Sequence, residues 1–199
     1  MIAIIDYGAG NLHSVKKAFN FLKKETIVAT EPKDLKEINK IVLPGVGAFE
    51  AAINKLKENG FYEIIKNWLI NNRPFLGICL GMQLLFEESM ESKESKGFGI
   101  FKGKCLKFEK GKVPQIGWNE IEIKKNSPLL TGIKNKTYFY FLHSYFVEPI
   151  DSEIIVATTN YYKNYPSIIE KGNIIGVQFH PEKSGEMGLK LLRNWVEKC

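Results

Sequence analysis

A cysteine between two glycines is the first feature of this sequence that could do chemistry. Cys79 stands in the segment Gly-Ile-Cys-Leu-Gly at residues 77–81, at the end of an apolar run. A strand, then Gly-X-Cys-X-Gly, then a helix (predicted over residues 82–88) is the cysteine version of the nucleophile elbow, whose strained turn exposes the reactive side chain. N–H groups at the start of that helix favour the thiolate, the reactive form of cysteine. The alternative is a small buried residue between two glycines that serve packing.

A cysteine nucleophile needs a base, and the sequence contains three histidines. His180 follows an apolar run and precedes Pro181 and Glu182. Pro181 keeps the chain extended, so His180 and Glu182 are predicted to project to the same side. A carboxylate there can hold the imidazole in one tautomer and stabilise its cation. His143, after an aromatic run, is the second candidate base, but no acid stands at a fixed offset from it. For either residue, a structural hydrogen bond is the alternative.

The remaining histidine and cysteines fit structural roles better. His13 falls early in a predicted helix and is expected to be a surface or capping residue. Cys105 lies inside an alternating strand and is predicted to belong to the core, whereas Cys199 ends the chain without a positioned base. Closely spaced Cys and His pairs are absent from the sequence, so we expect no metal site and no cofactor.

A glycine loop at residues 44–47, Pro-Gly-Val-Gly, follows another predicted strand. It lacks the Gly-Lys-Ser/Thr ending of a phosphate-binding loop. Backbone N–H groups of Gly45, Val46 and Gly47 would form an oxyanion hole if this loop lies beside the cysteine. A plain tight turn is the alternative.

The elements that must position these residues form one α/β domain over residues 1–199. In the first half, short apolar runs alternate with amphipathic stretches, which is the βαβ pattern of a parallel sheet. Strands are predicted at residues 2–5, 26–29, 40–43 and 75–78, and helices after a cap at Asn11 or Ser14, at Pro32 and at residues 49–57 and 61–70. We therefore expect a mixed, mostly parallel sheet flanked by helices.

The second half changes to alternating patterns. Residues 90–100 are polar and predict a surface loop. Strands are predicted at residues 105–108, 118–123, 138–141, 154–157, 167–170 and 174–179, with a hairpin at residues 171–173 and a final helix at residues 187–196.

Composition excludes several classes of protein. The chain carries a net charge of +6, but Arg73 and Arg193 are its only arginines and the lysines are scattered. Such a surface makes no steering patch, so we predict no nucleic-acid partner. No run approaches the ~18 apolar residues of a membrane span. The start lacks the basic segment of a signal peptide, and three cysteines fit a reducing compartment, so we expect a cytoplasmic location.

Segments 77–83 and 176–182 together resemble the triad-type (class I) glutamine amidotransferases. Four further segments, 6–12, 44–47, 117–119 and 140–145, are similar to the glutaminase subunits of imidazole glycerol phosphate synthases, enzymes of histidine biosynthesis. The resemblance covers essentially the whole chain. It implies a flavodoxin-like fold.

The resemblance also implies a reaction and a set of site residues. Cys79 would attack the side-chain amide carbon of glutamine, release ammonia and leave a glutamyl thioester that water hydrolyses. His180 would move the protons and Glu182 would orient it. N–H groups near residues 45–47 and at Leu80 would hold the oxyanion. The residues that would line the glutamine site are Gln83, Glu91, His143, Ser144 and Tyr145.

The family implies a partner, a (β/α)₈-barrel cyclase subunit, in a heterodimer. Ammonia would pass to it through a sheltered channel and react with a phosphorylated ribosyl-aminoimidazole, giving imidazole glycerol phosphate and an aminoimidazole carboxamide ribotide. Ile116 stands where the family usually has methionine, a departure expected to change packing rather than chemistry. The alternatives are a class I glutaminase serving anthranilate, guanylate or pyridoxal phosphate synthesis, and a catalytically silent subunit that activates its partner.

Overall fold

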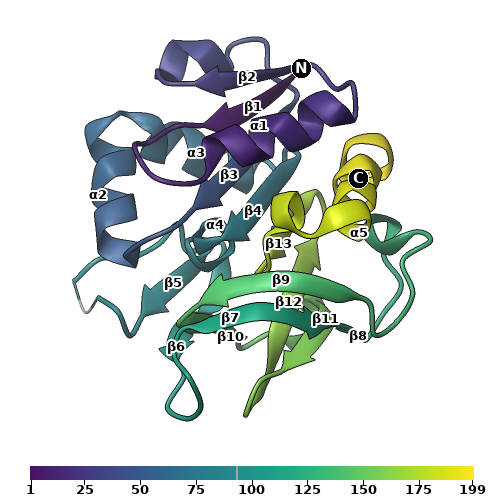
Figure 1. Ribbon diagram of the computed structural model, residues 1–199. Helices are drawn as coiled ribbons and strands as arrows, with labels where there is room; N and C mark the ends of the chain where they lie inside the picture. The colour runs from purple at the N-terminus through teal and green to yellow at the C-terminus, as the bar shows by residue number, and fades with distance from the viewer. Residues whose placement is uncertain (93) are drawn as a thin grey trace.

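The central sheet has eight strands in the order β2-β1-β3-β4-β13-β12-β11-β8 in the computed structural model, which describes residues 1–92 and 94–199 (Figure 1). Pairing is parallel from β2 to β13 and antiparallel from β13 to β8. The prediction of a mixed, mostly parallel sheet is therefore confirmed. The strand bounds are β1 Ile2–Ile5, β2 Thr26–Ala29, β3 Lys40–Gly45, β4 Phe75–Cys79, β8 Glu122–Ile123, β11 Ile155–Asn160, β12 Asn164–Lys171 and β13 Ile174–Val177.

Helices cover both faces of this sheet, because the buried strands are apolar on both sides (Figure 1). On one face, alternate strand residues such as Ala3 and Ile5 pack with α2 (Phe49–Glu58) and α3 (Phe61–Ile70). On the other face, Ile4 packs with α1 (Leu12–Phe21) and α5 (Gly185–Lys198). Of the two predicted caps for α1, the structure selects Asn11, whose side chain accepts from the Ser14 N–H.

Two smaller sheets stand beside the central one. The first has the order β10-β6-β5, with β5 Phe86–Ser89, β6 Phe101–Lys107 and β10 Tyr145–Pro149. The second pairs β7 (Gln115–Glu120) with β9 (Tyr138–His143). Short 3₁₀ turns join the elements: η1 Pro32–Leu35, η2 Pro128–Leu130, η3 Ser152–Ile154 and η4 Pro181–Lys183.

The helix predicted over residues 82–88 is wrong. The observed α4 covers only Leu80–Gln83, and β5 follows it. Leu84, Leu85 and Phe86 are all fully buried, which one face of a surface helix cannot provide. A short apolar run fits a helix or a strand equally well, and here the edge of β6 decides, because Phe86 pairs with Phe101 across the strands.

The segment 90–100 is less exposed than predicted. Ser92 and Phe98 are buried, and the Tyr62 ring stacks on Phe98 at 5.1 Å between centroids. Lys93 lies outside the described residues. Among the described residues, no helix combines the length and apolarity needed to cross a membrane.

Candidate active site

Three neighbouring strand ends bring the predicted reactive residues together. β3, β4 and β13 run parallel and adjacent, so their carboxyl ends meet at one edge of the sheet. Gly45, at the end of β3, is the register partner of Cys79, at the end of β4. His180 follows three residues after the end of β13. This edge is where ligands bind in open α/β sheets.

The backbone at Cys79 has the strained turn of a nucleophile elbow, with φ +54° and ψ −109°. At both flanking positions only glycine fits, because there is no room for a Cβ atom. A Cβ on Gly77 would lie 2.5 Å from the Gly81 carbonyl oxygen, and one on Gly81 would lie 1.9 Å from the Leu43 carbonyl oxygen. The packing role of the glycines and the strained turn at the cysteine are therefore two consequences of one arrangement.

His180 and Glu182 are paired and buried. The His180 Nδ1 lies 2.9 Å from Glu182 Oε1, and their side chains are 3% and 1% exposed. The backbone of this pair is held by the His180 N–H, which donates to the Tyr140 carbonyl, and by Ser184 Oγ, which donates to the His180 carbonyl. The predicted pairing of the two side chains is observed, but the predicted extended chain at Pro181 is wrong, because Pro181–Lys183 forms the 3₁₀ turn η4 and this turn brings Glu182 to His180.

The charge state of His180 follows from its neighbours. Burial by itself would lower the pKa of His180, but the Cys79 sulfur and the Glu182 carboxylate together raise that pKa to about 10. The Nε2 atom has no hydrogen-bond partner among the described residues, while Nδ1 is taken by Glu182. An imidazole with this pKa takes the Cys79 proton on Nε2 and keeps it at neutral pH, which favours a thiolate beside an imidazolium.

A cavity of about 290 Å³ opens directly on Cys79. Its size is at the lower end for small-molecule sites. Gly45, His180 and Glu182 lie outside its lining. It is lined by Val46, Gly47, Cys79, Leu80, Gln83, Glu91, Pro114, Leu142, His143, Ser144 and Tyr145. The five residues predicted to line a glutamine site thus converge on one cavity, although the chain separates them widely.

Comparison with known proteins gives the family of this chain. Residues 3–199 match the family model described as glutamine amidotransferase class-I. The chain belongs to this family. This amidotransferase is 48% identical over 202 residues to the "Imidazole glycerol phosphate synthase subunit HisH" of Caldanaerobacter subterraneus subsp. tengcongensis, with 100% of both chains covered. It is 49% identical over 200 residues to the protein of the same name from Methanocaldococcus jannaschii, with 99% of both covered.

Solved structures share the fold of this amidotransferase. One described as "Crystal structure of glutamine amidotransferase" has a TM-score of 0.79 at 16% identity, covering 99% of this chain and 98% of the other. "Structure of PurLQS from Thermotoga maritima" has a TM-score of 0.75 at 20% identity, covering 98% and 96%. At such identities the likeness concerns the fold alone.

His143 differs from His180 in its surroundings. Its Nδ1 lies 2.8 Å from the Tyr145 carbonyl oxygen and its Nε2 lies 3.2 Å from the Tyr165 hydroxyl, so both ring nitrogens are engaged. Burial lowers the pKa of His143 to about 4. Since a carbonyl only accepts, Nδ1 carries the proton and the ring stays neutral at pH 7. Of the two candidate bases, the geometry favours His180.

This burial makes a prediction about stability. A histidine with pKa about 4 when folded and about 6.5 when unfolded leaves the unfolded state with more bound protons below pH 6.5. Stability from this group is therefore lost as the pH falls through this window, by about 2 kcal/mol between pH 6.5 and pH 5. Denaturant unfolding of wild type and His143→Gln at both pH values should show that much less pH dependence in the variant. His13→Gln, at an exposed histidine of α1, is the matched control; an equal slope in all three proteins contradicts the expectation.

Glu91 has a structural role that the sequence did not indicate. Its Oε2 accepts the Phe49 N–H at 2.7 Å, which caps α2 from another segment because Ala48, the N-cap residue, has no polar side chain. Glu91 thus joins the loop after β5 to the helix after the glycine loop, while it also lines the cavity.

The glycine loop is loosely packed on its outer side. Val46 is half exposed, and Gly47 has φ +97° with free space around its Cα. Its inner side is tight, because a Cβ on Gly45 would lie 2.6 Å from the Tyr7 hydroxyl. That buried hydroxyl has no hydrogen-bond partner among the described residues.

Cys105 and Cys199 are separate from this site. Cys105 is fully buried, and burial raises the pKa of its thiol far above the usual range. At Cys199, burial and the nearby Glu170 carboxylate raise the pKa of the thiol to about 11. Neither supplies a reactive thiolate at neutral pH.

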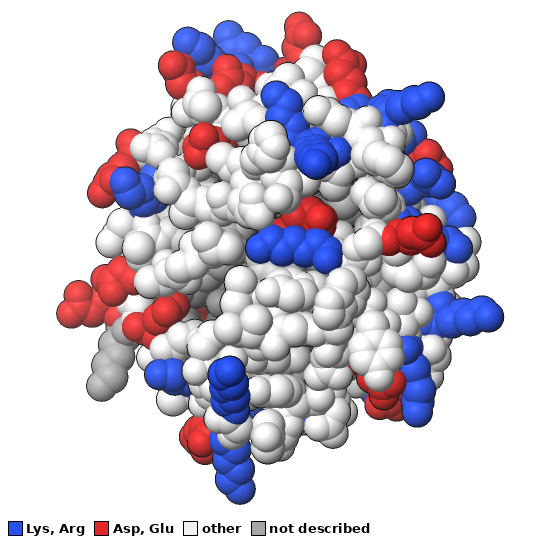
Figure 2. Space-filling model, viewed as in Figure 1, with Lys and Arg blue, Asp and Glu red and all other residues white. Residues whose placement is uncertain are grey.

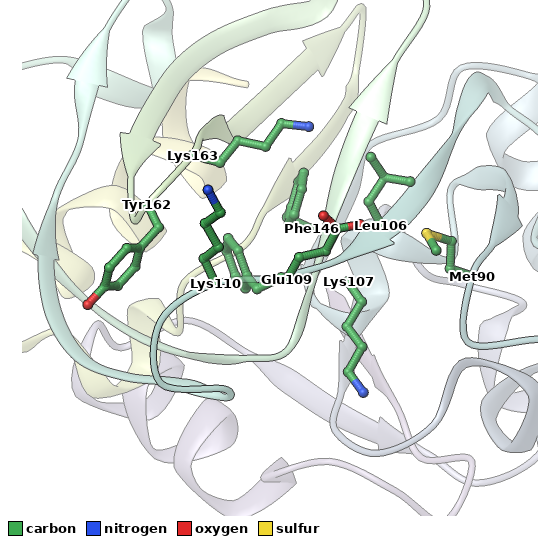
Figure 3. Close-up of a pocket in the computed structure, with 9 residues that line it drawn as sticks. Met90, Leu106, Lys107, Glu109, Lys110, Phe146, Tyr162 and Lys163 are labelled. Carbon is green, nitrogen blue, oxygen red and sulfur yellow. The ribbon is translucent and has the colours of Figure 1, made fainter.

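Figure 3 shows a second cavity, of about 310 Å³. Phe108 is among its lining residues, and the ring of Phe108 is 5.5 Å from that of His143. Lys107, Lys110 and Lys163 border it, and Lys163 is already paired with Glu148. Its lining includes the Glu109 carboxylate but no cysteine or histidine, so the Cys79 and His180 chemistry belongs to the other cavity.

Sequence reasoning missed three residues of the site. Pro114 and Leu142 line the cavity, and Gln178 contacts the Cys79 sulfur. A signal for Gln178 was present, because it belongs to segment 176–182, which carries the family resemblance. Leu142 lies in segment 140–145, which also carries the resemblance, whereas Pro114 carried no signal, since only the path of the chain brings it to the cavity.

Proposed function

We propose that this chain is a glutaminase subunit that releases ammonia from glutamine and passes it to a cyclase making imidazole glycerol phosphate and aminoimidazole carboxamide ribotide in histidine biosynthesis. The observation that carries the proposal is the alignment of Cys79, His180 and Glu182 at adjacent strand ends beside the cavity. The full-length relatives named as subunits of imidazole glycerol phosphate synthase support the pathway.

In the proposed reaction, His180 Nε2 takes the proton of Cys79 and the sulfur attacks the amide carbon of glutamine. Glu182, held on Nδ1, stabilises the imidazolium that results. The same imidazolium then protonates the leaving amide nitrogen, so ammonia departs and a thioester remains. Water, deprotonated by His180, hydrolyses the thioester to glutamate.

Backbone N–H groups from residues 45–47 and Leu80 are proposed to hold the oxyanion. The openness around Gly47 suits a peptide that turns toward the substrate. Gln83, Glu91, His143, Ser144 and Tyr145 are proposed to surround the glutamine, with Ser144 and Tyr145 at the mouth.

An exposed aromatic face supports a protein partner of the cyclase type. On the outer side of the β7–β9 pair, Trp118 opposes Tyr140 with ring centroids 6.1 Å apart, and Ile116 opposes Leu142. Trp118 is 55% exposed and Tyr138 56% exposed. In Figure 2 the area over β7 and β9 is mostly uncharged, with charged side chains around it. A surface of exposed aromatic residues with a polar rim is typical of protein interfaces.

This face is next to the nucleophile. The Leu142 carbonyl accepts from Cys79 Sγ at 3.6 Å, and Leu142 is one of the residues that line the cavity. A barrel docked on β7 and β9 would therefore cover the place where ammonia forms. The family departure at Ile116 falls on this face, where it would affect contact with the partner rather than the reaction.

Trp118→Ala is expected to weaken binding of the cyclase by about 30-fold, because an exposed tryptophan at the centre of an interface is a typical hot spot. Calorimetric titration with the cyclase measures the change. Tyr162→Ala, at a tyrosine that is 69% exposed outside this face, should leave the affinity unchanged. If both variants lost affinity for the cyclase equally, or if neither lost affinity, the partner would bind to another face.

The experiment that tests the function is ammonia release from glutamine by the purified chain, alone and with the cyclase loaded with its ribotide. Release that rises sharply with the loaded cyclase supports the proposal. Release indifferent to the cyclase would keep the glutaminase and favour another pathway, and capture of a different synthase from extract would name it. No release in any condition would favour the silent activating subunit.

A further inference from the structure

Gln178 touches the reacting sulfur from a fully buried position. It follows β13, its side chain is inaccessible to solvent, and its Nε2 lies 3.7 Å from Cys79 Sγ. A buried amide without partners is destabilising, so the contacts of the Gln178 amide determine how it is oriented.

The orientation of this amide follows from a backbone carbonyl. Gln83 Nε2 lies 2.8 Å from the Tyr145 carbonyl oxygen, which can only accept, so the nitrogen end of Gln83 must face it. The same nitrogen lies 3.3 Å from Gln178 Oε1 and donates to it. The oxygen of Gln178 is thereby occupied, and its N–H₂ group is left to face the sulfur.

Two neighbours of Cys79 act on its protonation in opposite directions. The Leu142 carbonyl, 3.6 Å from Sγ, accepts from the thiol and would repel a thiolate. The Gln178 amide donates a hydrogen bond to the sulfur, and this hydrogen bond is strongest when the sulfur is charged. The helix that starts after Cys79 is only four residues long, so its aligned peptide dipoles offer less than the predicted longer helix would.

We propose that Gln178 is a further catalytic residue, whose amide stabilises the Cys79 thiolate and is held in its donating orientation by Gln83 and the Tyr145 carbonyl. The proton that leaves the sulfur goes to His180 Nε2. Gln83 and Tyr145 also line the cavity, so a ligand there contacts the same hydrogen-bonded chain that ends on the sulfur. This inference rests on Cys79 as the nucleophile of the proposed function.

The test measures the thiol itself, without glutamine. Cys79 is alkylated with iodoacetamide from pH 5 to pH 10, and its peptide is quantified by mass spectrometry with the Cys199 peptide as internal reference. In Gln178→Leu, which keeps the size and removes the donor, the pH of half-maximal rate should rise by about one unit, and the rate at pH 7 should fall about tenfold. Ser167→Ala, at a buried neighbour of Gln178 on β12, should leave the profile unchanged.

The hydrogen bond from Gln83 to Gln178 gives a second criterion. Gln83→Leu should shift the profile in the same direction as Gln178→Leu, and the double variant should shift it no further than Gln178→Leu alone, because both act through one donor. If Gln178→Leu does not fold, Gln178→Asn serves, since a side chain shorter by one methylene withdraws the amide from the sulfur. An unchanged profile in a folded Gln178 variant would overturn the inference, as would additive shifts in the double variant.

The two proposals fail separately. A shifted alkylation profile without ammonia release in any condition would retain the role of Gln178 toward the sulfur and refute the glutaminase function. Ammonia release with an unshifted alkylation profile would retain the glutaminase function and refute the role of Gln178 toward the sulfur.

Discussion

Cys79→Ala should abolish ammonia release from glutamine, with a fall of about 10⁴-fold or more in kcat, because the reaction loses its nucleophile. The remaining site offers no second route: Cys105 is sealed in the core, and His143 has both ring nitrogens engaged. Alanine fills less space than cysteine beside the β3 and β13 ends, so the fold should persist. Ammonia release with the loaded cyclase, measured alongside circular dichroism, checks both parts.

Cys199→Ala is the matched control for this loss. Cys199 ends the chain after α5, away from the cavity, and should keep full activity when replaced. Turnover in Cys79→Ala within tenfold of wild type would show that another group attacks the substrate. If Cys199→Ala also lost ammonia release, the loss in Cys79→Ala would not be specific to that cysteine.

Glu182→Gln should lower kcat by about 10³–10⁴-fold with little change in KM, because an amide cannot stabilise the imidazolium and can select the wrong tautomer of His180. The substitution is isosteric in a site that is almost inaccessible to solvent, so it removes charge rather than volume. The pKa of His180 should fall, since burial lowers it and the Glu182 carboxylate is one of the groups that raise it. Ring-proton NMR titration of His180 gives the second readout.

The sign of the stability effect follows from the same shift. A histidine whose pKa is raised on folding stabilises the folded state below its unfolded pKa of about 6.5, and that contribution is lost as the pH rises through about 10. Glu182→Gln should therefore lose most stability below pH 6.5, and progressively less as the pH rises from 6.5 to about 10. Glu186→Gln, at an exposed glutamate of α5, is the control. If His180 titrated identically in Glu182→Gln and in wild type, the Glu182 carboxylate would not be a group that raises the pKa of His180.

Local sequence patterns were sufficient to predict an element where its conformation depends on residues close to it in the sequence. β1 and β2 were predicted to the residue, because both are four-residue runs rich in β-branched residues, and shortness and β-branching favour a strand over a helix. Glycines at residues 77 and 81 indicated the elbow, because only a backbone without side chains permits such close approach. By contrast, the helix predicted at residues 82–88 was wrong, since the edge of β6, distant in sequence, captures Phe86.

The sequence by itself determined the mostly parallel sheet, the family motifs and the pairing of His180 with Glu182, because these depend on spacing along one strand or turn. Only the tertiary structure decided which residues meet across strands. Gln178 reaches Cys79 because β13 lies beside β4, and Glu91 caps α2 because two loops converge at the cavity. Such contacts arise from strand order and chain path, which act between positions far apart and leave no period in the sequence.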